Sequence, residues 1–245
     1  MRKVIWSLFD SETAITQELN SDKYIVYSIG LPSSSAITDN FIKMDLSKRS
    51  CLKKLEKLPK PDIIFASPPC ETWVNMNICI VRYYKRNYNE YNLYWQKDFK
   101  PNNFAKHHRE NRLLGQKTAF YAAEIIKKFN PDLWCIENGA TSLIFKYINK
   151  INGLNGYKNL LYYDNYDSNL SLKPTYIFSN KKLLLKNNRN KVKYNKNKIA
   201  YSSSDKNKKD LVYKKDYCER SKVPIQLYQH ILNIYEGKQQ LNLDL

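Results

Sequence analysis

Cys70 has the clearest chemical potential of any residue in the chain, because it comes directly after a strand-like run and a rigid turn. Residues 63–66 (IIFA) are typical of a buried parallel strand, and Pro68 and Pro69 stop that strand and stiffen the turn. A thiol held on such a turn is suited to nucleophilic attack. A lone cysteine in a tight turn is more often a small apolar residue, so the rest of the chain has to decide between the two interpretations.

A carboxylate is expected at the same edge of the sheet. The apolar run 133–136 (LWCI) predicts another buried strand, and it is followed by Glu137, Asn138 and Gly139. The carboxyl ends of parallel strands are where open α/β sheets bind their ligands. Burying a carboxylate without a task is costly. The two strand ends together therefore indicate a nucleophile and an acid–base group in one site.

The first 46 residues predict the part of an α/β fold that usually holds a nucleotide-like cofactor. A strand over 3–9 is followed by a turn, a helix that begins near Ser11, a strand over 24–29 and a short strand over 41–46. The turn lacks glycines and is poorly built for pyrophosphate, but a cofactor without phosphates, such as S-adenosylmethionine, would not need that cradle. Asp45 could bind adenine or ribose, or it could cap the segment after it; both interpretations stay open.

The remaining elements suggest a nucleic acid as the partner. Residues 82–104 interleave aromatic rings with lysines and arginines, which suits stacking on bases, although a tyrosine-rich packing insert is equally compatible with the pattern. A helix is expected over 113–129, a β-hairpin over 160–180, and a closing helix after the turn at Val223. Residues 181–215 contain 13 lysines and arginines against two aspartates, so they predict a phosphate-binding arm or a solvated loop.

The composition is compatible with one sizeable α/β domain. The chain has 245 residues and a formal net charge of +18, which favours a polyanionic partner, although lysine-rich codon usage would raise the charge as well. Five cysteines without a CxxC or CxxH pair signal neither a disulfide framework nor a metal site. With no long apolar stretch, we expect no membrane association and a cytoplasmic location, in a bacterium or a phage-infected cell.

Taken in order, these elements resemble the cytosine-5 DNA methyltransferases, in particular the compact members of phages and prophages. The resemblance spans nearly the whole chain, and its specific part is SPPC with IENG at this separation. The matching segments are SLFDSETAITQEL (7–19), KMDL (43–46), SPPCETW (67–73), IENGA (136–140), LKPTYIFSN (172–180) and ERSKVPIQL (219–227). The resemblance implies a Rossmann-like S-adenosylmethionine-dependent methyltransferase fold with a mostly parallel sheet. It divides the chain into a catalytic domain (1–180), a small lysine-rich recognition region (181–218) and a closing motif with a helix (219–245).

The resemblance also assigns roles. Cys70, as a thiolate with a lowered pKa, would attack C6 of a flipped cytosine in double-stranded DNA, and Glu137 would bind the base. Asn138 would orient the loop of Glu137, Pro69 would support the nucleophile, and Lys173 is the candidate for the family's arginine. The expected cofactor is S-adenosylmethionine, the protein is expected to act as a monomer, and no metal is expected. The expected cofactor-binding residues are Phe9, Asp10, Ser11, Glu12, Thr13, Asp45, Leu46, Pro68 and Val223.

Three alternatives stay open at this point. RNA could be the substrate, because the same catalytic residues serve both nucleic acids. An exocyclic-amino methyltransferase also has a Pro-Pro loop, but with an aromatic ring where this chain has Cys70. A nucleic-acid-binding protein that kept the fold and lost catalysis is favoured by the first turn, which lacks Gly-x-Gly, and by the missing family arginine, whereas the presence of Cys70 and Glu137 opposes it.

Overall fold

The computed structural model describes residues 1–10, 18–31, 41–73, 103–170, 172–188 and 223–238, and within these ranges the side chains of 103–109 are not described. Three predictions fall outside these ranges: the helix after the first turn (11–17), the aromatic-rich segment up to 102, and most of the lysine-rich region (189–222).

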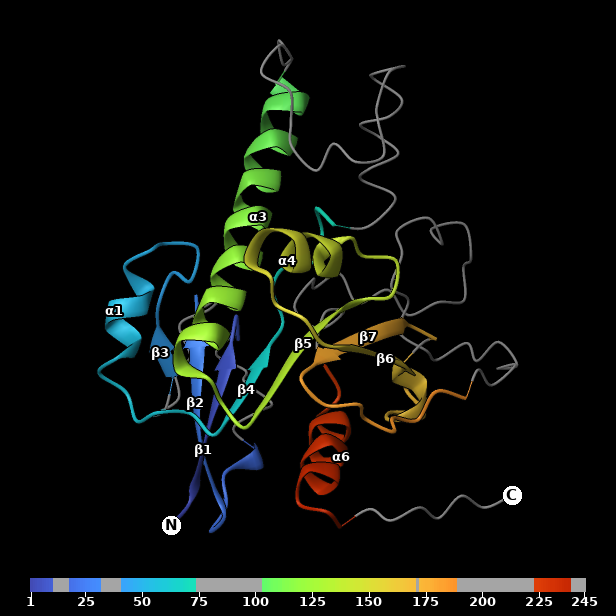
Figure 1. Cartoon of the computed structure of the whole chain (residues 1–245). Coiled ribbons are helices and arrows are strands. Elements are labelled where there is room, and N and C mark those ends of the chain that lie inside the picture. Colours follow the sequence, from blue (N-terminus) through green and yellow to red (C-terminus); the bar gives the residue numbers. More distant parts are fainter. Residues whose placement is uncertain (11–17, 32–40, 74–102, 171, 189–222, 239–245) are drawn as a thin grey trace.

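A seven-stranded sheet in the order β3-β2-β1-β4-β5-β7-β6 forms the centre of the molecule (Figure 1). The first five strands in this order pair in parallel, and β7 runs antiparallel to both β5 and β6. The strands are β1 (Lys3–Leu8), β2 (Tyr24–Gly30), β3 (Phe41–Lys43), β4 (Ile63–Ala66), β5 (Leu133–Gly139), β6 (Tyr157–Tyr162) and β7 (Pro174–Ser179).

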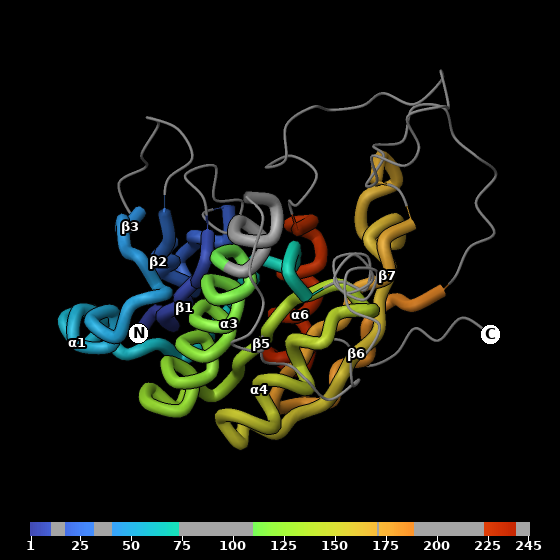
Figure 2. Tube along the Cα trace, turned by 90° about the horizontal axis from the view of Figure 1, so that it is seen from above, coloured from blue at the N-terminus to red at the C-terminus, as the bar shows by residue number. Residues whose placement is uncertain are grey.

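Helices cover both faces of this sheet, as Figures 1 and 2 show. On one face lie α1 (Cys51–Leu55), α3 (Asn103–Phe129) and α4 (Ile144–Asn152), whereas α6 (Ile225–Tyr235) packs on the other. All four residues of β4 are buried, because both of its faces are covered. The two faces therefore give two apolar clusters, separated by the sheet.

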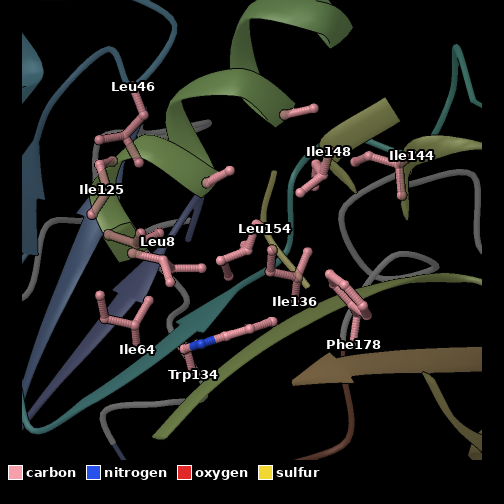
Figure 3. Packing of buried hydrophobic residues seen from close by; sticks show 14 of the residues in the cluster. Leu8, Leu46, Ile64, Ile125, Trp134, Ile136, Ile144, Ile148, Leu154 and Phe178 are labelled. Carbon is pink, nitrogen blue, oxygen red and sulfur yellow. The ribbon is translucent and has the colours of Figure 1, made fainter. Parts of the chain in front are cut away.

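The larger cluster joins the central strands to α3 and α4 (Figure 3). Its members on β1, β4 and β5 face those of the two helices, and all of them are almost completely buried. Examples labelled in Figure 3 are Leu8, Ile64, Ile136, Ile125 and Ile148. This packing fixes the carboxyl ends of β4 and β5, from which the candidate catalytic residues extend.

The strand order, with its single antiparallel strand β7 beside β5, is that of the Rossmann-like S-adenosylmethionine-dependent methyltransferase fold, so the expected fold class is confirmed. The expected strands at 63–66 and 24–29 and the closing helix after Val223 are also present. No helix in the described parts of the chain is long and apolar enough to cross a membrane.

Several boundaries differ from the sequence-based predictions. The strand expected over 41–46 ends at Lys43. Helix α3 begins ten residues earlier than the apolar pattern indicated. Strand β5 continues to Gly139, because its pairing with β7 extends beyond the apolar run, so Glu137 and Asn138 lie inside the strand.

Candidate active site

Cys70 and Glu137 belong to the same edge of the sheet. Strands β4 and β5 are parallel neighbours, and Ala66, the last residue of β4, pairs with Ile136. Glu137, the next residue of β5, therefore lies level with the first residue after β4. Cys70 follows β4 by four residues, in a turn closed by the hydrogen bond from the backbone N–H of Trp73 to the carbonyl of Cys70 (2.9 Å). The predicted convergence of the nucleophile and the carboxylate is therefore present.

The Cys70 turn is fixed on its far side by Trp73, which is completely buried. The guanidinium of Arg112 lies 3.9 Å from the centre of the Trp73 ring, and it donates a hydrogen bond to the carbonyl of Thr72. The ring of Tyr147 on α4 packs against Trp73 at 5.0 Å. Gly115 on α3 permits the close approach, because a Cβ there would lie 2.2 Å from Oγ1 of Thr72. Arg112 and Gly115 thus attach the turn to α3.

Asn138 fixes the same turn on its near side. Its Nδ2 donates to the carbonyl of Pro68 at 2.9 Å, and the whole side chain is buried. The sequence interpretation gave Asn138 the task of orienting the loop of Glu137. The structure shows it bonded to the carbonyl of Pro68, two residues before Cys70, so Asn138 couples β5 to the Cys70 turn. Pro69, next in the chain, is exposed.

Glu137 is itself bonded on one oxygen. The hydroxyl of Tyr163 donates to Oε1 of Glu137 at 2.7 Å, and Nζ of Lys173 lies 3.9 Å from the same oxygen. Glu137 is 8% exposed and Tyr163 is fully buried. Lys173 immediately precedes β7, whose antiparallel pairing with β5 brings this lysine beside the carboxylate. The predicted association of Lys173 with the site is therefore seen in its contact with Glu137.

The surroundings of the Cys70 thiol raise its pKa. Burial raises the pKa of Cys70 above the ordinary thiol value, and the charge of Glu137 raises it further. Lys173 acts in the opposite direction and lowers the pKa, while Glu71 adds a smaller upward effect. The sequence-based expectation of a lowered pKa for Cys70 is wrong for this arrangement, because desolvation and two carboxylates outweigh one cation.

The turn after β1 is shaped by backbone packing, without a glycine of its own. Phe9 adopts φ = 62°, a conformation that is uncommon for a bulky residue and often found at functional sites. The N–H of Asp10 donates to the carbonyl of Ile29 at 3.2 Å, which brings the turn against the end of β2. A Cβ on Gly30 would lie 2.1 Å from the carbonyl oxygen of Asp10, so only glycine fits there. The expected cofactor residues Ser11, Glu12 and Thr13 lie outside the described residues.

Asp45 forms a local turn beyond β3. Its Oδ1 accepts hydrogen bonds from the backbone N–H and the hydroxyl of Ser47, and Lys48 forms an ion pair with its Oδ2 at 3.2 Å. These contacts lower the pKa of Asp45, with the Ser47 hydroxyl as the largest cause. Leu46 and Val223, the apolar residues expected at the cofactor, are both buried members of the two apolar clusters.

Four residues of this region were missed by the sequence interpretation. Gly30 and Arg112 fix backbone positions, and Tyr163 bonds to Glu137. The fourth is Tyr228 on α6, whose pKa is raised first by burial and then by the charges of Asp10 and Glu137. Only Gly30 had a local signal, since a glycine at a strand end often marks close backbone approach; the other three depend on tertiary contacts.

No group of three or more possible metal ligands is present in the described parts of the chain. The chemistry that these residues offer is that of a thiol, a carboxylate and an ammonium group at one edge of the sheet. The fold and this set define an α/β protein of the Rossmann-like methyltransferase fold with a thiol and a carboxylate at one edge of its sheet.

A scan against protein-family models and a search of curated proteins both give no match. Among solved structures, the chain is similar to the methyltransferase EhMeth of Entamoeba histolytica, with a TM-score of 0.48 and 15% identity over 80% of this chain and 62% of that one. It is similar to the Dnmt2 methyltransferase of S. pombe, with a TM-score of 0.44 and 14% identity over 88% of this chain and 57% of that one.

A third similar structure is a putative DNA modification methyltransferase encoded within a prophage of E. coli, with a TM-score of 0.39 and 12% identity over 73% of this chain and 46% of that one. The chain thus spans between 46% and 62% of the lengths of these three structures.

Proposed function

We propose that this protein methylates C5 of a cytosine in DNA, with Cys70 as the nucleophile and S-adenosylmethionine as the methyl donor. The observation that supports it best is the placement of Cys70 and Glu137 at one sheet edge, where the charge of Glu137 raises the pKa of Cys70 and the ammonium of Lys173 lies 3.9 Å from Oε1 of Glu137. A thiol and a carboxylate in this arrangement suit attack on C6 of a cytosine and proton exchange at the opposite side of the ring.

The cofactor fits the residues present beyond β1 and β3. A nucleoside without phosphates requires hydrogen-bond acceptors for its ribose and apolar surface for its base, and the partly exposed side chains of Asp45 and Phe9 would offer these groups, with Leu46 packed beneath them in the apolar cluster. The tight turn at Phe9 and Asp10, which depends on the missing Cβ of Gly30, would form the wall of that site. When bound, S-adenosylmethionine supplies the electrophilic methyl group that C5 accepts.

The residues of this chain would then act in sequence on a cytosine flipped out of the duplex. The Cys70 thiolate forms a bond to C6, and the electron pair of the C5–C6 double bond moves to C5. Glu137 supplies a proton or a hydrogen bond at N3, which stabilises that charge. After C5 is methylated, a general base removes the proton from C5. The C5–C6 double bond then re-forms and the Cys70 thiolate leaves C6.

Base binding itself would make the nucleophile more reactive. The negative charge of Glu137 is one cause of the raised pKa of Cys70. When Glu137 shares a proton with N3 of the base, that charge is reduced, and the thiolate becomes easier to form. Lys173, which lowers the pKa of Cys70, remains beside it throughout. The thiol would therefore stay neutral until a base is in place, which protects it from other electrophiles.

The experiment uses a DNA duplex with 5-fluorocytosine at mixed sites, together with S-adenosylmethionine. Fluorine does not leave C5 as a proton does, so the reaction stops at the covalent protein–DNA adduct. We expect a band that survives denaturation and disappears in Cys70→Ala. Cys135→Ala removes another buried free cysteine, on the neighbouring strand β5, and should retain the band.

Each other outcome has a definite meaning. An adduct that forms only on RNA would overturn DNA as the substrate and keep the chemistry. An adduct retained in Cys70→Ala would overturn the assignment of the nucleophile. No adduct on either nucleic acid would overturn the reaction and favour a protein that binds nucleic acid without modifying it.

A further inference from the structure

Tyr163 is a fully buried tyrosine whose hydroxyl donates a 2.7 Å hydrogen bond to Oε1 of Glu137. It begins a single helical turn, η2 (Tyr163–Asn165), which follows β6. Nothing in the resemblance or in the sequence pattern assigns it a role. We propose that Tyr163 is a positioning residue for Glu137: it occupies Oε1, so that Oε2 is the oxygen that exchanges a proton with the base. This inference rests on the proposed function.

Two donors converge on one oxygen of Glu137. The Tyr163 hydroxyl lies 2.7 Å from Oε1, and the ammonium of Lys173 lies 3.9 Å from it. A proton placed on Oε1 would have to compete with both donors for the lone pairs of that oxygen. The proton of a neutral Glu137 therefore belongs on Oε2, which, among the described residues, is the oxygen that these two donors leave to accept from or donate to a nucleobase.

The two donors are also fixed to each other. The backbone N–H of Tyr163 donates to the carbonyl of Lys173 at 3.3 Å, and the Lys173 ammonium lies 4.5 Å from the centre of the Tyr163 ring. The carbonyl of Tyr163 in turn accepts from the N–H groups of Tyr166 and Asp167 at 2.9 and 3.0 Å. The hydroxyl is thus held on a rigid turn, so it can fix the carboxylate before the substrate arrives.

A purely structural role would predict a different pattern of effects. Tyr163 belongs to the apolar cluster on the α6 face of the sheet, and its ring contributes to packing there. Replacing the tyrosine by phenylalanine keeps the ring and removes only the hydroxyl. If the hydroxyl acts only on stability, its loss should resemble the loss of any other buried, hydrogen-bonded hydroxyl.

Tyr166 offers the matched control. It lies three residues further along, it is buried, and its hydroxyl is also hydrogen-bonded, to Nδ1 of His230 at 3.0 Å and to the N–H of Lys186 at 2.9 Å. Its partners belong to α6 and to the segment after β7, not to Glu137. Tyr166→Phe therefore removes the same chemical group at a similar structural cost.

The experiment compares wild type, Tyr163→Phe and Tyr166→Phe by the rate of adduct formation on 5-fluorocytosine DNA and by the kcat and KM of methylation. We expect Tyr163→Phe to lower the adduct rate and kcat about 10- to 100-fold, the usual cost of losing a supporting hydrogen bond at a site. The KM for S-adenosylmethionine should change less than about twofold, since the hydroxyl contacts Glu137 and not the cofactor side. Tyr166→Phe should keep both rates within about twofold.

Wild-type rates in Tyr163→Phe, or an equal loss in Tyr166→Phe, would overturn the inference alone. A loss that appears in the KM for the cofactor and not in kcat would overturn it as well. A wild-type protein that forms no adduct and transfers no methyl group would overturn the proposed function, and the inference with it. The two failures are distinct, because the first concerns a variant of an active protein.

Discussion

The two sides of the sheet's carboxyl edge are built by different means. On the base side, which we name after the proposed function and define as Cys70, Glu137, Asn138, Tyr163 and Lys173, the last four side chains bond to one another or to a neighbouring carbonyl. On the cofactor side, which we define as Phe9, Asp10, Gly30 and Asp45, the shape comes mainly from the backbone. The polar side chain there, Asp45, is paired locally with Ser47 and Lys48.

The difference shows where the chain is tolerant of change. A buried polar contact is lost when either partner changes, so the base side depends on specific side-chain types at distant positions. A backbone turn can keep its shape with many sequences, provided that no side chain obstructs it. The cofactor side can therefore lack the usual glycines after β1, because a glycine on the neighbouring strand provides the space. The largest effect of a small change on that side should come from Gly30.

Gly30→Ala is the first test of this comparison. Its Cβ would lie 2.1 Å from the carbonyl oxygen of Asp10, and this backbone atom cannot rotate away. The turn must shift, at a cost of about 1–3 kcal/mol, and we expect affinity for S-adenosylmethionine to fall about tenfold or more. Isothermal titration calorimetry with the cofactor measures this directly.

Gly139→Ala is the control on the base side. A Cβ at Gly139 meets nothing within 4 Å, so the same substitution should leave cofactor affinity within about twofold. Equal losses in the two variants would show that the spacing at Gly30 has no particular part in the cofactor site. Unchanged binding in Gly30→Ala would refute the backbone-built cofactor side altogether.

The charges of the base side predict the second effect. The pKa of Cys70 is raised first by burial and then by Glu137, and it is lowered by Lys173. The pH dependence of Cys70 alkylation by iodoacetamide should therefore have a midpoint above about pH 8.5, the value for an ordinary thiol. Glu137→Gln should shift the midpoint down and Lys173→Met should shift it up, each by about one pH unit or less.

Mass spectrometry of the peptide that contains Cys70 separates its alkylation from that of the other four cysteines. Asp45→Asn serves as the control, because Asp45 is not among the causes of the shift at Cys70. A midpoint that moves in the same direction for both base-side variants would show that a structural change, and not charge, controls the thiol.

On the base side, the sequence predicted the features that a local residue pattern determines. It missed the features that depend on tertiary contacts. Strand β4 was predicted residue for residue, because its apolar run is bounded by Asp62 and by the turn that two prolines enforce. Glu137 was expected after a strand, but the pairing of Glu137 with Ile177 of β7 extends β5, and no local apolarity signals such a pairing. The Tyr163 hydroxyl is 26 residues away from Glu137 in the chain, so only the folded hairpin reveals the contact.

The cofactor side was predicted less completely for a physical reason. The sequence left Asp45 with two roles, a cofactor contact or a cap for the segment after it. Its contacts with Ser47 and Lys48 form a local turn. The N-cap of the helix that follows is Ser50, so Asp45 does not cap that helix. The turn after β1 has no glycine of its own, and the glycine that gives it space is on β2. Backbone packing between two strands leaves almost no recognisable pattern in the sequence. The turn after β1, which lacks Gly-x-Gly, therefore gave no sign that Gly30 provides the space it needs.

The smallest effect should come from Asp45→Asn. The hydroxyl of Ser47 and the charge of Lys48 lower the pKa of Asp45, so the carboxylate contributes stability above its unfolded pKa of about 3.9, and this contribution is lost as the pH falls through the lower folded pKa. The Asp45–Lys48 pair is partly exposed and screened by solvent, and asparagine still accepts a hydrogen bond from Ser47. Urea unfolding at pH 7 should therefore show a loss of less than about 1 kcal/mol, and the gap between wild type and variant should narrow below about pH 4. A gap that widens on acidification would mean that the carboxylate is not stabilised by these partners. In that case the contrast between the locally paired Asp45 of the cofactor side and the polar contacts of the base side would be refuted.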